Sequence, residues 1–191
     1  FVNPINSEDL SYIQAFFVPS IYMNSDTIGV IDDGYGMSIT TVMTKPKSRG
    51  YVKLKSSNFK DNPEIELNLL KHEHDLRMMM AGQRFFLEAL KTGPLSKKVK
   101  KIIIPDTANL TDENLEKHCK RFVRTNYHPS GTAKMGADSD KMAVLDSKLR
   151  VRGIENLRVC DLSAMPNINS GNTSAPAMML GLRCGDFLTL N

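Results

Sequence analysis

The chain has 191 residues, of which 41% are hydrophobic, and its 25 Lys and Arg against 21 Asp and Glu leave a formal net charge of +4. This composition is enough for one domain with a substantial core or for two small lobes, whereas so small a charge does not indicate nucleic-acid binding. No run approaches the roughly 20 apolar residues that a membrane-spanning helix needs, so we expect no membrane span.

The start of the chain predicts a helix followed by irregular backbone. Ser7 before Glu8 and Asp9 is typical of a helix N-cap, and we expect a short helical segment through Phe17. Residues 21–36 are polar and contain turn-forming Asp and Gly, so they are expected to be irregular. Because the first residue is phenylalanine rather than methionine, we expect the chain to start internally; a secretory signal could have been lost with the missing start, which leaves localisation open.

Strands are predicted next. β-branched residues dominate 37–44, and the pattern breaks at 46–50. Strict alternation of apolar and polar residues over 51–55 predicts a second strand, which we expect to pair with the first as a hairpin with one solvated face. Residues 65–69 alternate again and predict a third strand.

Two helices are predicted after these strands. Apolar residues recur at helical spacing over 72–92, and Gly93-Pro94 is expected to stop the helix. Its Met and Phe side chains are interpreted as core residues and not as a cofactor site. Thr111 is expected to cap a second helix that runs to about Thr125. The residues expected to face the core are Leu76, Met79, Met80, Gln83, Phe86, Leu87 and Leu90 in the first helix, and Leu115, Cys119, Phe122 and Val123 in the second.

After residue 140 the chain predicts short strands and one final helix. The last helix is expected from about Thr173 to Leu188, with Pro176 in its first turn, where proline is tolerated. Three apolar pieces bounded by turn residues predict strands at 143–146, 149–151 and 157–161. In all, the pattern predicts an α+β protein, with a mostly antiparallel sheet and packed helices.

Several common site motifs are missing from the sequence. Gly34-Tyr35-Gly36 lacks the third glycine of a dinucleotide fingerprint, because position 39 is Ile. His72 and His74 are spaced i, i+2 at a helix start and face two directions, so no metal site is predicted. The cysteines contain no CxxC pair and are expected to be buried free thiols, at Cys119, Cys160 and Cys184.

A candidate base for alcohol oxidation is His128. Removing a hydride from the carbon of an alcohol requires a base for the hydroxyl proton, and histidine, with an ordinary pKa of about 6.5, suits that task. Pro129 restricts the residue before it to extended backbone, which would hold the imidazole in one direction, and Gly131 follows closely. From the residues alone, a purely structural role for His128 stays open.

A candidate partner for this base is Asn172. Its carboxamide can donate to and accept from a substrate hydroxyl. The helix expected to start beside it adds free N–H groups and partial positive charge, which would stabilise the negative charge that a reduced flavin gains on its pyrimidine side. A simple capping role for Asn172 also stays open.

The segment 127–188 strongly resembles the C-terminal part of the glucose–methanol–choline (GMC) family of flavin oxidoreductases, and 45–52 is similar to that family's substrate-domain hairpin. The pattern is closest to insect glucose dehydrogenase-like members, many of which carry Cys where Ala133 stands, a change expected to alter packing and not chemistry. The matching blocks, in order, are Tyr127-His128-Pro129-Ser130-Gly131-Thr132-Ala133-Lys134-Met135-Gly136, Ala143-Val144-Leu145-Asp146, Leu149-Arg150-Val151-Arg152-Gly153, Leu157-Arg158-Val159-Cys160-Asp161, Ser163-Ala164-Met165-Pro166 and Ser170-Gly171-Asn172-Thr173-Ser174-Ala175-Pro176.

The resemblance implies a cofactor, FAD, and a role for individual residues. His128 matches the family's catalytic base, and Asn172 matches the second member of its active-site pair. The positions that match FAD-contacting segments are Tyr127, Asp161, Leu162, Asn172 and Thr173. The implied substrates are small-molecule alcohols or sugars, with oxygen or a quinone-like compound as electron acceptor.

The resemblance also implies how the chain is divided. Residues 1–139 would be a portion of the substrate-binding domain with the catalytic His loop, and 140–191 would return to the FAD-binding domain and complete it with a strand and a helix. The N-terminal FAD-binding Rossmann unit would be absent from this chain and act as its missing partner. We therefore expect the isolated chain to bind FAD poorly. A hydroxynitrile lyase-like relative and a non-catalytic, truncated binding module remain as alternatives.

Overall fold

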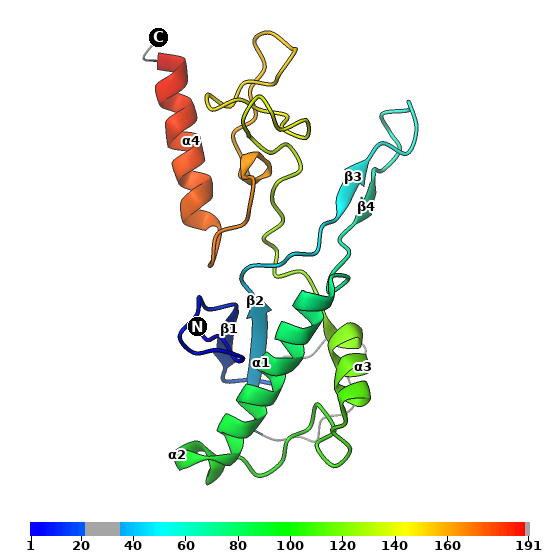
Figure 1. Cartoon of the computed structure of the whole chain (residues 1–191), viewed down its shortest axis with the longest axis vertical. Coiled ribbons are helices and arrows are strands. Elements are labelled where there is room, and N and C mark those ends of the chain that lie inside the picture. Colours follow the sequence, from blue (N-terminus) through cyan, green and yellow to red (C-terminus); the bar gives the residue numbers. More distant parts are fainter. Residues whose placement is uncertain (22–34, 190–191) are drawn as a thin grey trace. The chain divides into compact units, whose positions relative to one another are not determined.

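The computed structural model describes residues 1–21 and 35–189 and shows a mixed α and β protein with small antiparallel sheets, as the sequence predicts (Figure 1). The chain divides into two compact units. The first unit comprises residues 1–48 and 68–124, and the second comprises 49–67 and 125–191. The irregular segment predicted at 21–36 lies almost entirely outside the described residues.

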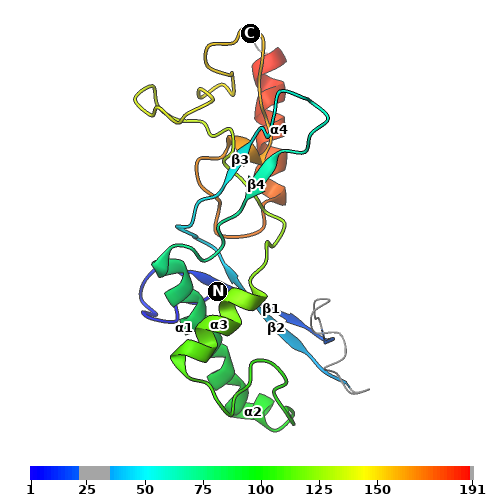
Figure 2. The same ribbon diagram turned by 90° about the vertical axis from the view of Figure 1, so that its right-hand side faces the viewer.

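The first unit contains a two-stranded antiparallel sheet of β1 (Ile13–Val18) and β2 (Ser38–Met43), whose strands lie side by side in Figure 2. The helix predicted through Phe17 is wrong, because its second half is β1. This stretch is rich in β-branched and aromatic residues, and pairing with β2 outweighs the helix-cap signal at Ser7. The predicted hairpin of 37–44 with 51–55 is wrong as well, since β2 pairs with the upstream strand.

The predicted helices of the first unit are confirmed. Helix α1 (Glu73–Lys91) begins after His72, whose side chain accepts a hydrogen bond from the amide of His74, so this histidine acts as a helix cap. Helix α3 (Asp112–Phe122) begins after Thr111, whose hydroxyl accepts from the Asn114 amide at 3.2 Å. Between them, residues 93–94 end the long helix as expected but also open a short one, α2 (Gly93–Ser96).

The core of the first unit lies where α1 meets α3 and the sheet. Ile13 of β1 is completely buried, and a Cβ atom at Gly82 of α1 would lie only 3.1 Å from its Cγ1 atom. A glycine at this position therefore lets the helix approach the strand closely. The buried cluster between the helices consists of Leu70, Met79, Leu115 and Cys119.

We expect Gly82→Val to destabilise the protein by about 1–3 kcal/mol, because its methyl groups would have to displace the buried side chain of Ile13. Thermal denaturation of the full-length protein measures the effect. Ala81→Val, at a half-buried neighbouring position, is the matched control and should cost less than about 1 kcal/mol. Equal losses for the two variants would contradict the role assigned to the glycine.

A buried carboxylate fixes the turn that leaves β2. Asp75 in the first turn of α1 is only 1% exposed. Its Oδ1 and Oδ2 atoms accept the Lys47 amide at 2.9 and 3.0 Å, and Oδ2 accepts the Ser48 amide at 2.7 Å. The backbone break that the sequence indicates at 46–50 is thus held by a side chain almost thirty residues away.

The second unit combines a short hairpin with a looped segment and a long helix. Strand β3 (Tyr51–Lys53) pairs antiparallel with β4 (Glu64–Glu66), so the strands predicted at 51–55 and 65–69 exist over shorter ranges. The chain then turns through η2 (Leu162–Ala164) into α4 (Ser174–Thr189), which confirms the predicted last helix. The strands predicted after residue 140 appear as single-residue bridges, at Leu145, Arg150, Val151 and Arg158.

Helix α4 packs one side against these turns (Figure 1). The buried cluster comprises Leu145, Leu149, Ala164, Leu180 and Cys184. Cys119 and Cys184 are buried, as predicted, and burial raises the pKa of the Cys119 thiol to about 11. The prediction for Cys160 is wrong, because this residue is exposed. Cys160 was expected to be buried in a strand, but the chain forms only a single bridge here, at Arg158.

Candidate active site

The loop that carries His128 is tied to the η2 segment by a row of backbone hydrogen bonds. They join the amides of Gly131, Ala133 and Met135 to the carbonyls of Leu162, Ser163 and Ala164, at 3.1, 3.0 and 2.8 Å. Gly131 has φ +85° and comes within 3.2 Å of the Met165 carbonyl at the position of its missing Cβ, so a side chain there would meet both strain and contact. The loop therefore has a fixed path past η2.

Unusual backbone lies on both sides of His128. Tyr127, directly before it, has φ +62°, and Gly131 follows with its own positive φ. A left-handed conformation costs a tyrosine roughly 1–3 kcal/mol, and such strain clusters at functional sites. The Tyr127 amide donates to the Thr125 hydroxyl at 3.1 Å, which helps to hold this turn, while the tyrosine side chain is exposed.

The imidazole of His128 contacts the start of α4. Its Nδ1 atom lies 2.8 Å from the hydroxyl oxygen of Thr173, 45 residues further along the chain. Thr173 is only 3% exposed, and its carbonyl accepts the Ala177 amide at 3.0 Å in the first turn of the helix. His128 itself is half-buried. The structure thus brings the histidine loop to the N-terminus of α4.

Asn172 lies at the same helix end, next to Thr173, and is exposed. The turn before it is held by Asn169, whose amide nitrogen donates to the carbonyls of Gly171 and Asn172, both at 3.1 Å. The Oδ1 atom of Asn169 is buried and has no hydrogen-bond partner among the described residues. Asn169 was not predicted from the sequence, although asparagine in a Gly-containing turn is a known signal of side-chain-to-backbone bonding.

The two other predicted residues, Asp161 and Leu162, lie at the η2 segment to which the histidine loop is hydrogen-bonded. The Asp161 carboxylate accepts the Ser163 amide at 2.7 Å and the Ser163 hydroxyl at 2.5 Å, and thereby caps η2. Leu162 is half-buried, and its carbonyl is the one that receives the Gly131 amide. Every residue predicted to act in catalysis or to contact FAD therefore lies in the second unit, around η2 and the start of α4.

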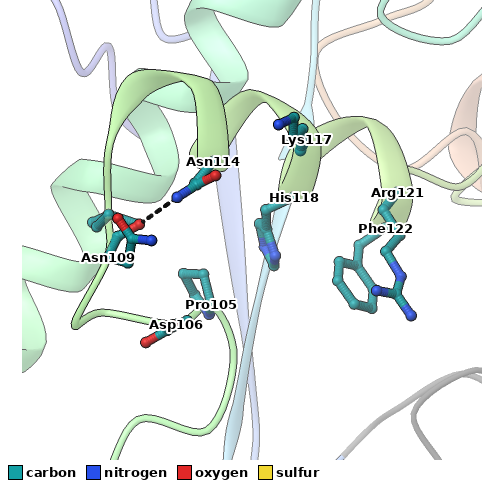
Figure 3. A pocket seen from close by; sticks show the side chains of 9 residues that line it. Pro105, Asp106, Asn109, Asn114, Lys117, His118, Arg121 and Phe122 are labelled. Atoms are coloured by element: carbon teal, nitrogen blue, oxygen red, sulfur yellow. Dashed lines mark hydrogen bonds between the residues drawn. The ribbon is translucent and has the colours of Figure 1, made fainter.

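A separate hollow of about 370 Å³ lies in the first unit, along one side of α3 (Figure 3). It contains none of the predicted site residues. Burial lowers the pKa of His118 within it, and the Lys117 ammonium is paired with Glu113 at 2.6 Å. The lining residues are Pro105, Asp106, Asn109, Leu110, Asn114, Lys117, His118, Arg121 and Phe122.

Over 1–21 and 35–189, no helix has the length and apolar character needed to cross a membrane. Within the same ranges, His, Cys, Asp and Glu side chains do not gather in a group of three or more that could hold a metal ion.

Comparison with known proteins defines the class to which this arrangement belongs. A model of the GMC oxidoreductase family matches residues 46–181, and the chain belongs to this family as its C-terminal domain. It is 39% identical over 92% of its length to an oxygen-dependent choline dehydrogenase of Vibrio vulnificus. It is 33% identical over 98% of its length to an alcohol dehydrogenase (acceptor) of Pseudomonas putida.

Among solved structures, a formate oxidase of Aspergillus oryzae, studied for modification of its FAD, is similar with a TM-score of 0.74 and 28% identity. That match covers 84% of this chain and 28% of the oxidase. The chain likewise spans 31% and 33% of the two dehydrogenases, about a third of the length of the relatives it matches.

Proposed function

We propose that the chain is the C-terminal portion of an FAD-dependent oxidoreductase that oxidises the CH–OH groups of small alcohols or sugars. The observation that carries the proposal is the contact of His128 with Thr173, which brings an imidazole to the N-terminus of α4, where the exposed Asn172 is the residue before Thr173. A base and a two-way hydrogen-bonding group are what an alcohol needs when it loses a hydroxyl proton and a hydride.

In this proposal the side chains of this chain handle the proton. The His128 imidazole takes up the hydroxyl proton of the substrate, and Asn172 holds the substrate oxygen through its amide. FAD, when bound, supplies the acceptor for the hydride.

The donor set at the start of α4 fits a flavin. The helix N-terminus carries partial positive charge, which suits the pyrimidine side of a flavin. The buried, unpartnered Oδ1 atom of Asn169 offers an acceptor close to that end. On this reading, Thr173, Tyr127, Asp161 and Leu162 would lie against the cofactor, as the family resemblance implies.

One face of α4 supports the proposal that another part of the full-length protein covers this unit. Met178, Met179 and Leu182 are 67%, 52% and 70% exposed, although apolar side chains grouped in this way normally mark a contact surface. We infer that residues 140–191 return to an FAD-binding domain, and that 1–139 form the substrate-binding portion with the histidine loop. The greater length of the relatives is consistent with this division.

Alcohols are the first substrate class to test, because the similar proteins include a choline dehydrogenase and an alcohol dehydrogenase. Sugars are the second, because the motifs around His128 resemble those of insect glucose dehydrogenase-like proteins. The alternative of a hydroxynitrile lyase-like protein uses the same histidine without net redox chemistry, and that of a binding module uses no catalysis.

We expect the full-length protein, purified with FAD, to lose its visible flavin absorbance when choline, a simple primary alcohol or glucose is added without oxygen. Bleaching by any of them supports the proposal and indicates the substrate class. Release of cyanide from a cyanohydrin with no bleaching by the three compounds would favour the lyase. A protein that retains no flavin, or shows neither reaction, would contradict an oxidoreductase.

A further inference from the structure

We propose that Thr173 is a positioning residue that sets the tautomer of His128, by accepting the Nδ1–H of the imidazole and leaving Nε2 without a hydrogen. The inference rests on the proposed function, because a histidine that acts as a base needs its second ring nitrogen free of a proton. It goes further by naming the residue that makes one of the two ring nitrogens the reactive one.

The contact with Thr173 is compatible with either neutral tautomer of the His128 imidazole. The Thr173 hydroxyl oxygen lies 2.8 Å from Nδ1, and a hydroxyl can donate or accept. If the hydroxyl donates, Nδ1 holds the lone pair and Nε2 carries the hydrogen, so neither nitrogen can receive a proton from a substrate. If the oxygen accepts from Nδ1–H, Nε2 presents its lone pair. The partner of one ring nitrogen thus decides the state of the other.

The position of Thr173 favours the accepting arrangement. Thr173 directly precedes α4 (Ser174–Thr189), and a side-chain oxygen at such a cap position normally accepts from the amide of the second or third helical residue. The third residue here is Pro176, which has no N–H to give. The cap oxygen therefore lacks one of its usual donors, and the Nδ1–H of His128 can take that place.

Because Thr173 is buried, its hydroxyl is shielded from water and keeps His128 as its partner. With Thr173 only 3% exposed, water has little access to compete for the hydroxyl. The tied backbone of the histidine loop brings the imidazole to the hydroxyl, since Gly131 is bonded to the Leu162 carbonyl. After proton uptake both ring nitrogens carry hydrogens, and the same threonine oxygen still has a donor facing it. Proton transfer to Nε2 therefore requires no rearrangement at Nδ1.

The first test is spectroscopic and uses the full-length protein. With ¹⁵N-labelled histidine, and the His128 signal assigned by its loss in His128→Gln, we expect the nitrogen shifts of the neutral ring to report hydrogen on Nδ1. Hydrogen on Nε2 would overturn the inference. This readout does not depend on turnover, so it stands even if no alcohol reduces the flavin, in which case the proposed function fails separately.

The second test compares Thr173→Val with Thr173→Ser. Valine keeps the shape without the oxygen, so we expect kcat to fall about 10-fold to 100-fold with KM nearly unchanged, and the neutral ring to shift toward hydrogen on Nε2. Serine restores the oxygen and should restore both readouts. Thr107→Val, an exposed threonine in the first unit, is the matched control.

A valine variant with unchanged kcat and an unchanged tautomer would overturn the inference. The same holds for a serine variant that loses as much as valine, because a hydroxyl would then not be what matters. If the valine variant does not fold, the spectrum of the unsubstituted protein still decides the question.

Discussion

Replacing His128 with alanine in the full-length protein is expected to slow the reduction of flavin by substrate about 10²-fold to 10⁴-fold, the usual contribution of a general base. The alcohol would have to give up its proton to water, while the loop around residue 128 would keep its backbone bonds to η2. Those bonds involve main-chain atoms from Gly131 onward, so the loss of the imidazole should leave the site otherwise in place.

Anaerobic rapid mixing measures this effect directly, as the rate at which visible flavin absorbance disappears. His118→Ala is the matched control, because that histidine lines the hollow on α3 in the first unit and takes no part in the proposed chemistry. An unchanged rate of reduction in the His128 variant would remove the assignment of this residue as the base.

Replacing Asp75 with alanine is expected to lower the free energy of unfolding by about 2–4 kcal/mol. The carboxylate is 1% exposed and accepts the amides of Lys47 and Ser48. Without it, two partly shielded backbone N–H groups at the exit of β2 would lose their partner, and each such group costs about 1–3 kcal/mol when water does not replace that partner.

Urea unfolding of the full-length protein, followed by far-ultraviolet circular dichroism, measures the change. Asp75→Asn keeps one carbonyl oxygen and should lose about half as much as alanine. Glu73→Ala, an exposed acidic residue in the same first turn of α1, is the control and should change the stability by less than about 0.5 kcal/mol. If the exposed and the buried acids gave equal losses, the anchoring role of Asp75 would be wrong.

The helices could be predicted from the sequence because their signals are local. The start of α3 depends on Thr111 and the amide of Asn114, only three residues apart. The long helix α1 has apolar residues at helical spacing along its whole length, and a glycine–proline pair follows its end. Signals of this kind need no knowledge of distant parts of the chain.

The pairing of the strands could not be predicted in this way. Residues 13–18 form too short an apolar run for their periodicity to separate strand from helix. Ile13 of β1 is buried next to Gly82 of α1, and the turn after β2 is held by Asp75. Both contacts join residues far apart in sequence, where local patterns carry no information.

In the candidate active site, too, the residue types could be predicted from the sequence, whereas a contact between distant residues could not. The motifs around His128 and Asn172 indicated the residue types that the chemistry requires, and the structure brings both segments to one end of α4. Their catalytic roles remain a prediction. The hydroxyl of Thr173 facing Nδ1 could not be read from spacing, because it depends on the path of the loop over η2 and on where the helix begins.

The apolar face of α4 has a chemical consequence of its own. The thioethers of Met178 and Met179 stand largely open to solvent on this unit, whereas Met135 and Met165 are half-buried against its core. Peroxide converts accessible methionines to polar sulfoxides and spares shielded ones. If the full-length protein has the proposed activity and passes electrons to oxygen, it would generate that oxidant itself, and covering Met178 and Met179 would protect the helix from it.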